Sequence, residues 1–262
     1  MFIIGELING MYKKIGLALR QKDKAVIQAC ALAQVKAGAD ALDVNCGPGS
    51  SDPAADMRWL VEAIQEVTDT ALSLDSSKPA VIEAGLSVLK GKAVINSTTA
   101  DPEKLEALVP LAKKHNAKLI GLTISAKGIP QNKDMRLELA AQIVAACSDM
   151  GFPLENLYLD PIVMPVNVAQ SQMLDILTAM QEFKIISDPA PKSIVGLSNV
   201  SQGTKNRSLI NRTFLVMAAA CGLDAAILDP LDEQLMAAAI TSDLIRNRQI
   251  YCDSYLDAYR KK

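Results

Sequence analysis

The sequence predicts a single (β/α)₈ barrel, or TIM barrel, of the α/β class. Short runs rich in Val, Ile and Leu alternate eight times with stretches whose apolar residues recur at three- and four-residue spacing. The 262 residues are close to the about 250 that are typical of this fold. Half of the residues are hydrophobic but only 4% are aromatic, as expected for buried parallel strands covered by Ala-rich helices.

The eight apolar runs each end in polar or turn-forming residues. They are FIIGELI (2–8), ALDVNC (41–46), ALSLDS (71–76), AVINST (93–98), LIGLTI (119–124), LYLDPI (157–162), SIVGLSN (193–199) and AAILDP (225–230). Helical spacing is clear in 54–67, 103–114, 136–147, 170–186 and 211–220. Right-handed crossovers between parallel strands place every helix outside a closed barrel. An open doubly wound sheet is the alternative, but the first run lacks the glycine-rich phosphate turn that such a sheet carries.

No linker rich in glycine or serine divides the chain, so we expect one domain over residues 1–245. Residues 246–262 fall outside the repeat. Tyr251, Tyr255 and Tyr259 lie four residues apart and would form one stripe on a helix. We expect this helical tail to pack on the barrel or to lie at a dimer contact.

Composition argues against several classes of partner. The formal net charge is −2, so no basic excess favours nucleic acid or an anionic membrane surface. No apolar run reaches the about 18 residues of a membrane span, and the N-terminal segment lacks the features of a signal peptide. The five cysteines are scattered and never form a CxxC pair, which is typical of reduced thiols. We therefore expect a cytoplasmic protein.

Acids and amides dominate the positions that close the apolar runs. In a barrel the carboxyl ends of the strands build the active site, so these residues are expected to converge on one mouth. They are Glu6, Asn9, Asp43, Asn45, Asp75, Asn96, Thr123, Asp160, Ser198, Asn199 and Asp229. Any one of them could simply cap a helix. The single histidine, His115, ends a helix that precedes a strand, which places it at the opposite end of the barrel.

This set of residues limits the chemistry. The mouth is expected to have no histidine base, no Ser-His pair and no His/Cys metal cluster. Several carboxylates could still hold Mg²⁺, but no phosphate-binding glycine loop accompanies them. Carboxylates accept from N–H groups, and amides both accept and donate. A flat heterocycle such as a 2-amino-4-oxo-pterin suits these groups, because its N2 and N3 hydrogens match the two oxygens of a carboxylate.

Six segments together resemble the methyltetrahydrofolate–corrinoid protein methyltransferases, which are pterin-binding barrels. The segments are Ile4–Gly10 (IGELING), Ala41–Pro48 (ALDVNCGP), Leu74–Ser76 (LDS), Ile95–Thr98 (INST), Leu159–Pro161 (LDP) and Gly196–Gln202 (GLSNVSQ). They occur in order on six expected strands. The resemblance continues through Asn206-Arg207 and Tyr251–Ser254 (YCDS).

The resemblance implies that Asp75, Asn96 and Asp160 hold the pterin and that Asn199 reaches its N5 atom as the catalytic residue. It implies a supporting set of substrate-binding residues: Glu6, Asp43, Ser198, Gln202 and Arg207. The substrate would be tetrahydrofolate or methyltetrahydrofolate, with no metal of the protein's own. Cobalamin would arrive on a corrinoid protein, either a corrinoid iron–sulfur protein or a small corrinoid protein of a demethylase system. The family also suggests a homodimer.

The expected reaction is an in-line transfer of a methyl group between N5 and cobalt. N5 is a poor leaving group that gains electron density as its bond to the methyl group breaks. A donor aimed at N5 helps most if its hydrogen bond strengthens in the transition state. Asn199 is an uncharged donor of this kind, whereas the source of the N5 proton stays open, as does the direction of transfer.

Two alternatives remain. A dihydropteroate synthase-like pterin enzyme would carry Ser-Arg-Lys near its seventh strand and Arg-x-His at its eighth, where this chain has LSNVSQ and ILDP. A folate-binding subunit without turnover is compatible with the same fold, although binding alone does not require Asn199. The loops 46–54 and 125–134 either frame a docking surface, close over folate or merely connect elements.

Overall fold

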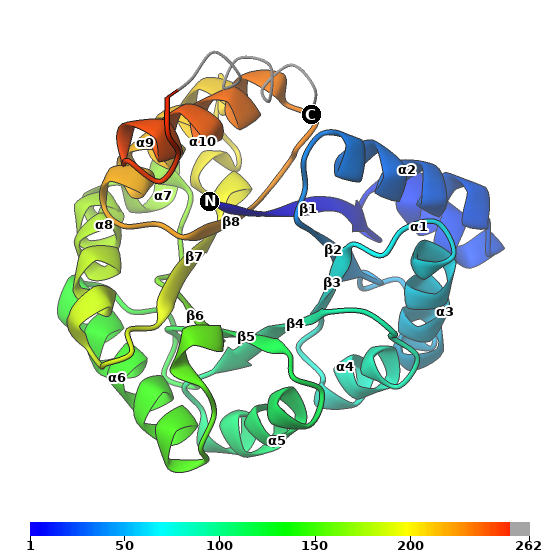
Figure 1. The fold of residues 1–262 in the computed structure, drawn as a ribbon, viewed down its shortest axis with the longest axis horizontal. Coiled ribbons are helices and arrows are strands. Elements are labelled where there is room, and N and C mark those ends of the chain that lie inside the picture. Colours follow the sequence, from blue (N-terminus) through cyan, green and yellow to red (C-terminus); the bar gives the residue numbers. More distant parts are fainter. Residues whose placement is uncertain (252–262) are drawn as a thin grey trace.

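A computed structural model describes residues 1–251 and contains a closed barrel of eight parallel strands (Figure 1). Each strand pairs with the next, and β8 pairs with β1. The strands are β1 (Phe2–Asn9), β2 (Ala41–Asn45), β3 (Ala71–Asp75), β4 (Ala93–Thr99), β5 (Lys118–Leu122), β6 (Leu157–Asp160), β7 (Lys192–Gly196) and β8 (Ala225–Leu228). The eight apolar runs fall on these strands in order, which confirms the predicted (β/α)₈ barrel.

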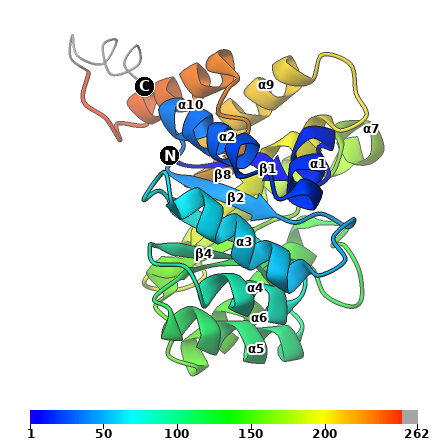
Figure 2. The ribbon, with the colours of Figure 1, turned by 90° about the vertical axis from the view of Figure 1, so that its right-hand side faces the viewer.

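Helices surround the ring of strands in Figure 1, and Figure 2 shows α1 and α7 toward the same end of the barrel. The α-helices are α1 (Lys13–Gln21), α2 (Lys24–Lys36), α3 (Pro53–Gln65), α4 (Pro79–Leu86), α5 (Pro102–Lys114), α6 (Lys133–Asp149), α7 (Val166–Ala169), α8 (Met173–Glu182), α9 (Arg207–Ala220) and α10 (Glu233–Ile245). The 3₁₀ turns are η1 (Leu154–Asn156), η2 (Gln170–Gln172), η3 (Phe183–Ile185) and η4 (Leu197–Ser201). Side-chain caps start α2, α3 and α6, where Asp23, Asp52 and Asn132 accept backbone N–H groups.

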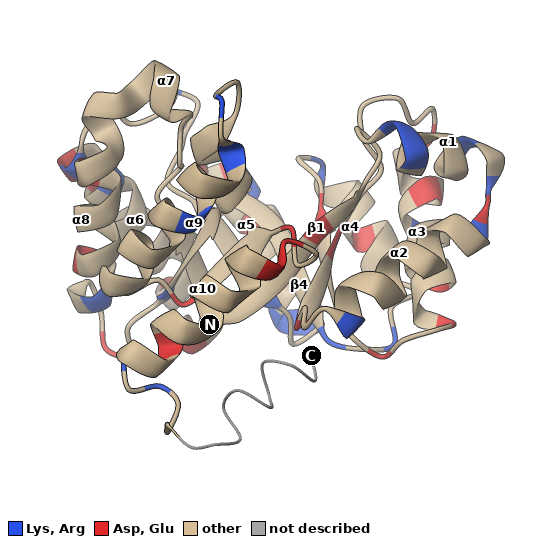
Figure 3. Ribbon diagram, turned by 90° about the horizontal axis from the view of Figure 1, so that it is seen from above, with Lys and Arg blue, Asp and Glu red and all other residues tan. Residues whose placement is uncertain are grey.

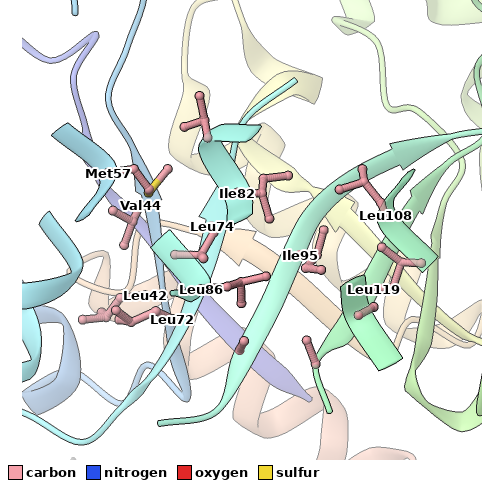
Figure 4. Packing of buried hydrophobic residues seen from close by; sticks show 14 of the residues in the cluster. Leu42, Val44, Met57, Leu72, Leu74, Ile82, Leu86, Ile95, Leu108 and Leu119 are labelled. Carbon is pink, nitrogen blue, oxygen red and sulfur yellow. The ribbon is translucent and has the colours of Figure 1, made fainter. Parts of the chain in front are cut away.

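The largest core cluster lies between the strands and their helices (Figure 4). Outward-facing Leu42 and Leu74 are 0% exposed, and they pack with Met57 of α3 and Ile82 of α4 in this cluster. Burying a side chain of this size stabilises the fold by about 1.5–3 kcal/mol. This apolar layer holds the strands in place and so fixes the positions of the side chains on their inner faces.

Inside the barrel, apolar and polar layers follow each other. A buried cluster includes Ile4, Ala41, Val94 and Tyr158. Side chains two residues apart on a strand share a face, so the next inward position on each of these strands faces the same interior. Those next positions carry Glu6, Asp43, Asn96 and Asp160. The apolar layer therefore closes the barrel beneath a polar layer.

Two strands that carry polar side chains contain a bulge. The β1–β2 register shifts between Gly5 and Ile8, and the β4–β5 register shifts between Asn96 and Thr98. The buried Gln34 accepts the Leu7 N–H at 3.0 Å beside the first bulge. An extra residue in one strand bends it and changes the direction of nearby side chains. Both bulges adjoin predicted site residues, Glu6 and Asn96.

The structure differs from the predicted ranges at the seventh run. The strand ends at Gly196, and residues 197–201 form the 3₁₀ turn η4. Ser198 and Asn199 therefore project from a turn, because their backbone no longer pairs with a neighbouring strand. Helix α10 ends at Ile245, and most of the expected tail, including Tyr255 and Tyr259, lies outside the described residues.

Acidic and basic residues are interspersed along the helices (Figure 3). Within residues 1–251, no helix combines the length and apolar character needed to cross a membrane. The four cysteines of that range, Cys30, Cys46, Cys147 and Cys221, are free thiols.

Candidate functional site

The polar layer opens into a cavity of about 360 Å³ at the carboxyl ends of the strands. Eight of the nine predicted site residues line it: Glu6, Asp43, Asp75, Asn96, Ser198, Asn199, Gln202 and Arg207. They come from β1, β2, β3, β4, η4, the residue that follows η4 and the start of α9. The volume lies in the range of small-molecule sites. Residues that are up to 201 positions apart in the sequence (6 to 207) therefore meet at one mouth.

On one side of the mouth, carboxylates of β2 and β3 are held by side chains. Asp43 Oδ1 accepts hydrogen bonds from Ser73 Oγ at 2.7 Å and from Asn96 Nδ2 at 3.0 Å. Asp75 Oδ2 accepts one from Asn45 Nδ2 at 2.6 Å. The donors and acceptors lie on the three consecutive strands β2, β3 and β4, so the sheet itself sets the spacing.

Burial raises the pKa of Asp43, and the nearby charge of Asp75 raises it further. Hydrogen bonds from Ser73 and Asn96 oppose the rise. Burial also raises the pKa of Asp75, while hydrogen bonds with Asn45 and Asp43 oppose it. Two close carboxyl groups resist being charged together, so this pair retains a proton more readily than isolated acids do.

A second polar group links β1 to η4. Ser198 Oγ donates to Glu6 Oε1 at 2.7 Å. Arg207 donates from Nε to Ser201 Oγ at 3.1 Å and from Nη2 to the Ser198 carbonyl at 3.2 Å. Burial raises the pKa of Glu6, whereas the Ser198 hydrogen bond and the Arg207 charge lower it. Arg207 thus fixes the turn that carries Ser198 and Asn199.

The side-chain amide of Asn199, like that of Gln202, has no hydrogen-bond partner among residues 1–251, whereas the Asn96 amide donates to Asp43. Asn199 is exposed on η4 and lies over Gly196, where an added Cβ would be 3.0 Å from Asn199 Nδ2. A contact this short leaves little room for a side chain at position 196. The Asn199 donor is therefore free to meet a ligand in the cavity.

Asp160 is the predicted residue that does not line this cavity. It ends β6 and is buried, with 8% of its surface exposed. Its Oδ1 accepts the Ile162 N–H at 2.7 Å, and it also accepts the backbone N–H of Gly196, which lines the cavity. Burial raises the pKa of Asp160 to about 6, although both backbone hydrogen bonds lower it. Asp160 thus borders the site.

The structure adds residues that sequence reasoning did not assign to the site: Met11, Tyr12, Gly196 and Ile227 also line the cavity. Asn9, which was expected at the mouth without an assigned role, lines it as well. Asn9 carried a signal as a polar residue that closes a strand, whereas Met11 and Tyr12 follow in a loop without any pattern. Their positions depend on how the β1–α1 loop returns over the mouth.

A second cavity of about 420 Å³ adjoins the first, because Met11 and Asp75 line both. Its other walls include Asn45 and part of the 46–53 loop. Gly10 and Gly47 bring two loops into contact here, since a Cβ on Gly10 would lie 2.1 Å from the Cys46 carbonyl oxygen. The other long loop, at 125–128, lines a separate cavity of about 350 Å³ next to α5 and α6.

His115 lies at the end of α5, before β5, and does not line the cavity. In residues 1–251, no three His, Cys, Asp or Glu side chains are placed to hold a metal ion. Three acids and one arginine line the cavity. This balance suits a ligand that donates hydrogen bonds and disfavours one with several negative charges, such as a diphosphate.

Comparisons with known proteins relate the chain to pterin-binding enzymes. The family model described as pterin binding enzyme matches residues 13–229. A methylcorrinoid:tetrahydrofolate methyltransferase from Eubacterium limosum is 28% identical over 100% of this chain and 97% of its own length. A methionine synthase from Mycobacterium leprae is 28% identical over 87% of this chain, which spans only 20% of that protein.

Two solved structures share the fold. A dihydropteroate synthase from Coxiella burnetii in complex with pteroic acid has a TM-score of 0.71 at 16% identity, covering 95% of this chain and 94% of that one. The Yersinia pestis dihydropteroate synthase has a TM-score of 0.67 at 19% identity, covering 94% and 93%. At such identities the likeness concerns the fold alone. Because the family match covers residues 13–229, which include strands β2 to β8, the protein belongs to the pterin binding enzyme family.

Proposed function

We propose that this protein is a methyltransferase that moves a methyl group between N5 of methyltetrahydrofolate and the cobalt of a corrinoid protein. One observation carries the proposal: a mouth rich in carboxylates and amides, in which the Asn199 amide has no partner among residues 1–251, lies in a chain that matches a methylcorrinoid:tetrahydrofolate methyltransferase over its whole length. The carboxylate acceptors suit the hydrogen-donating edge of a pterin.

In this proposal Asp75, Asn96 and Asp160 bind the pterin ring. Glu6, Asp43, Ser198, Gln202 and Arg207 support them or contact the rest of folate. Their fixed hydrogen bonds orient N5 before reaction, which reduces the entropy lost in reaching the transition state.

Asn199 is the catalytic residue. Its Nδ2 donates a hydrogen bond to N5 as that atom gains electron density, and no protein acceptor competes for it among the described residues. The reduced corrinoid supplies a nucleophilic cobalt centre when it docks. Met11 and Tyr12 line the cavity and are exposed to solvent, so the mouth is accessible to a docking partner.

The corrinoid reaches the site on a partner, either a corrinoid iron–sulfur protein or a small corrinoid protein of a demethylase system. We infer that the protein acts in the cytoplasm as a homodimer and without a metal of its own. Sedimentation tests the dimer, metal analysis of the purified protein tests the last point, and a pull-down from cell extract identifies the partner.

The direct test incubates the purified protein with methyltetrahydrofolate and cobalamin reduced to cobalt(I). Loss of the cobalt(I) spectrum together with formation of tetrahydrofolate is the expected result. The reverse reaction, from methylcobalamin to tetrahydrofolate, should also proceed. Binding of folate without demethylation would support a folate-binding subunit instead.

A further inference from the structure

Arg136 is a buried cation that the proposed reaction does not use. It lies in the first turn of α6, with 0% of its surface exposed, and it forms no ion pair among residues 1–251. The charge of Asp175 acts on Arg136 without forming an ion pair, and a buried charge of this kind is costly unless hydrogen bonds satisfy it. The contacts that satisfy Arg136 therefore indicate what it holds.

The guanidinium joins three segments at the carboxyl end of the barrel. Nε donates to the Pro161 carbonyl at 2.8 Å, Nη1 to the Asn132 carbonyl at 3.0 Å and Nη2 to Gln172 Oε1 at 2.8 Å. These acceptors belong to the loop after β6, to the start of α6 and to η2. Arg136 thus fixes the loop that begins at Asp160.

One peptide group connects Arg136 to Asp160. The Pro161 carbonyl, which accepts from Arg136, belongs to the same planar unit as the Ile162 N–H. That N–H donates to Asp160 Oδ1 at 2.7 Å. Since the C=O and N–H of a trans peptide point in opposite directions, Arg136 and the Asp160 carboxylate occupy its two ends. The orientation of this peptide therefore determines whether the carboxylate keeps the Ile162 N–H as one of its two backbone donors.

This peptide has a less strained alternative. Ile162 has φ of 62°, a left-handed conformation that a β-branched residue rarely adopts. Turning the Pro161–Ile162 peptide over would return Ile162 to negative φ. It would also withdraw the N–H from Asp160 and the carbonyl from Arg136. The hydrogen bond from Arg136 opposes that rotation.

We propose that Arg136 is a positioning residue that holds the Asp160 carboxylate in its pterin-binding orientation through the Pro161–Ile162 peptide. This role rests on the proposed function and extends it to a side chain outside the cavity. Arg136 controls folate affinity through Asp160 and makes no contact with the substrate.

A double-mutant cycle on the full chain tests the proposal. The dissociation constant of methyltetrahydrofolate is measured for the wild type, for Arg136→Met, for Asp160→Ala and for the double variant. Arg136→Met is expected to raise the constant about tenfold in the wild-type background and less than twofold in the Asp160→Ala background. A purely structural role would raise it equally in both.

Arg246→Met is the matched control. Arg246 also donates to a backbone carbonyl, that of Leu223 at 2.7 Å, but it follows α10 and lies outside the cavity. This variant should leave folate affinity unchanged. Denaturant unfolding checks that each variant is folded at the assay temperature.

If Arg136→Met does not fold, Gln172→Ala removes one acceptor and keeps the charge. It should raise the dissociation constant about twofold to threefold in the wild-type background and not in Asp160→Ala. Equal effects in both backgrounds, or no effect, would overturn the positioning role. A wild-type protein that binds no folate would overturn the proposed function itself, which is a distinguishable result.

Discussion

The two sides of the barrel mouth hold their carboxylates by different means. On the β2–β4 side, Asp43 and Asp75 receive hydrogen bonds from the side chains of Ser73, Asn96 and Asn45. On the β6–β7 side, the Asp160 carboxylate receives backbone N–H groups. The first arrangement joins side chains of three consecutive strands, and the second depends on a turn with positive φ at Ile162.

The two sides should therefore differ in how well they tolerate substitution. A side-chain network can adjust, because each donor has its own rotatable bonds. A backbone donor in a strained turn has one useful orientation and needs an external tether. The β6–β7 side also carries the unpartnered amide of Asn199, so we expect it to be more sensitive to substitution.

The largest expected effect concerns the two amides, one from each side. Asn199→Ala should lower kcat about 100-fold with little change in folate affinity, because it removes a donor that acts in the transition state. Asn45→Ala is the matched control, since its amide already donates to Asp75. It should weaken folate binding and change kcat little.

Steady-state kinetics and direct binding measurements separate the two effects. Equal losses of kcat and affinity in Asn199→Ala would mean that this side chain only binds.

A smaller effect is expected from removing one acid on each side. Asp75→Ala and Asp160→Ala should each weaken tetrahydrofolate binding by about 1–3 kcal/mol, the usual cost of removing the partner of a buried polar group. Titration calorimetry measures both. If one variant binds as the wild type does, the acid on that side only serves the fold.

The smallest effect concerns stability against pH. The pKa of Asp160 in the folded protein is raised from 3.8 to about 6. The folded protein therefore binds a proton at Asp160 more tightly than the unfolded chain does, and protonation of Asp160 stabilises the fold. The stability that wild-type Asp160 contributes is therefore complete below about pH 4 and is lost as pH rises through 6. Asp160→Asn lacks this loss, so its free energy of unfolding should rise relative to wild type by about 2 kcal/mol between pH 4 and 7.

Urea unfolding at several pH values checks this prediction. Asp43→Asn, on the other side of the mouth, should change in the same direction because burial also raises the pKa of Asp43. A difference between Asp160→Asn and wild type that stays constant with pH would show that Asp160 is not buried as a carboxylate.

Much of the site was predictable because strands have a period of two residues. Val94 faces the barrel interior, so Asn96 on the same strand faces it as well. The same rule applies to Tyr158 and Asp160. The bulges were not predictable, since the register between strands depends on pairing with a distant segment. Met11 and Tyr12 were missed for a related reason, because a loop has no period that shows where it returns.

The sequence alone determined the order of strands and helices, the barrel and the acids and amides at the strand ends. These features depend on local periodicity, which neighbouring residues encode. Only the tertiary structure decided that Asp43 and Asp75 share an environment that raises their pKa, that the Asn199 amide lacks a partner within residues 1–251 and that Arg136 reaches the peptide behind Asp160. Burial, charge and strain at these positions depend on groups brought together from distant parts of the chain, and closure of the barrel brings them there.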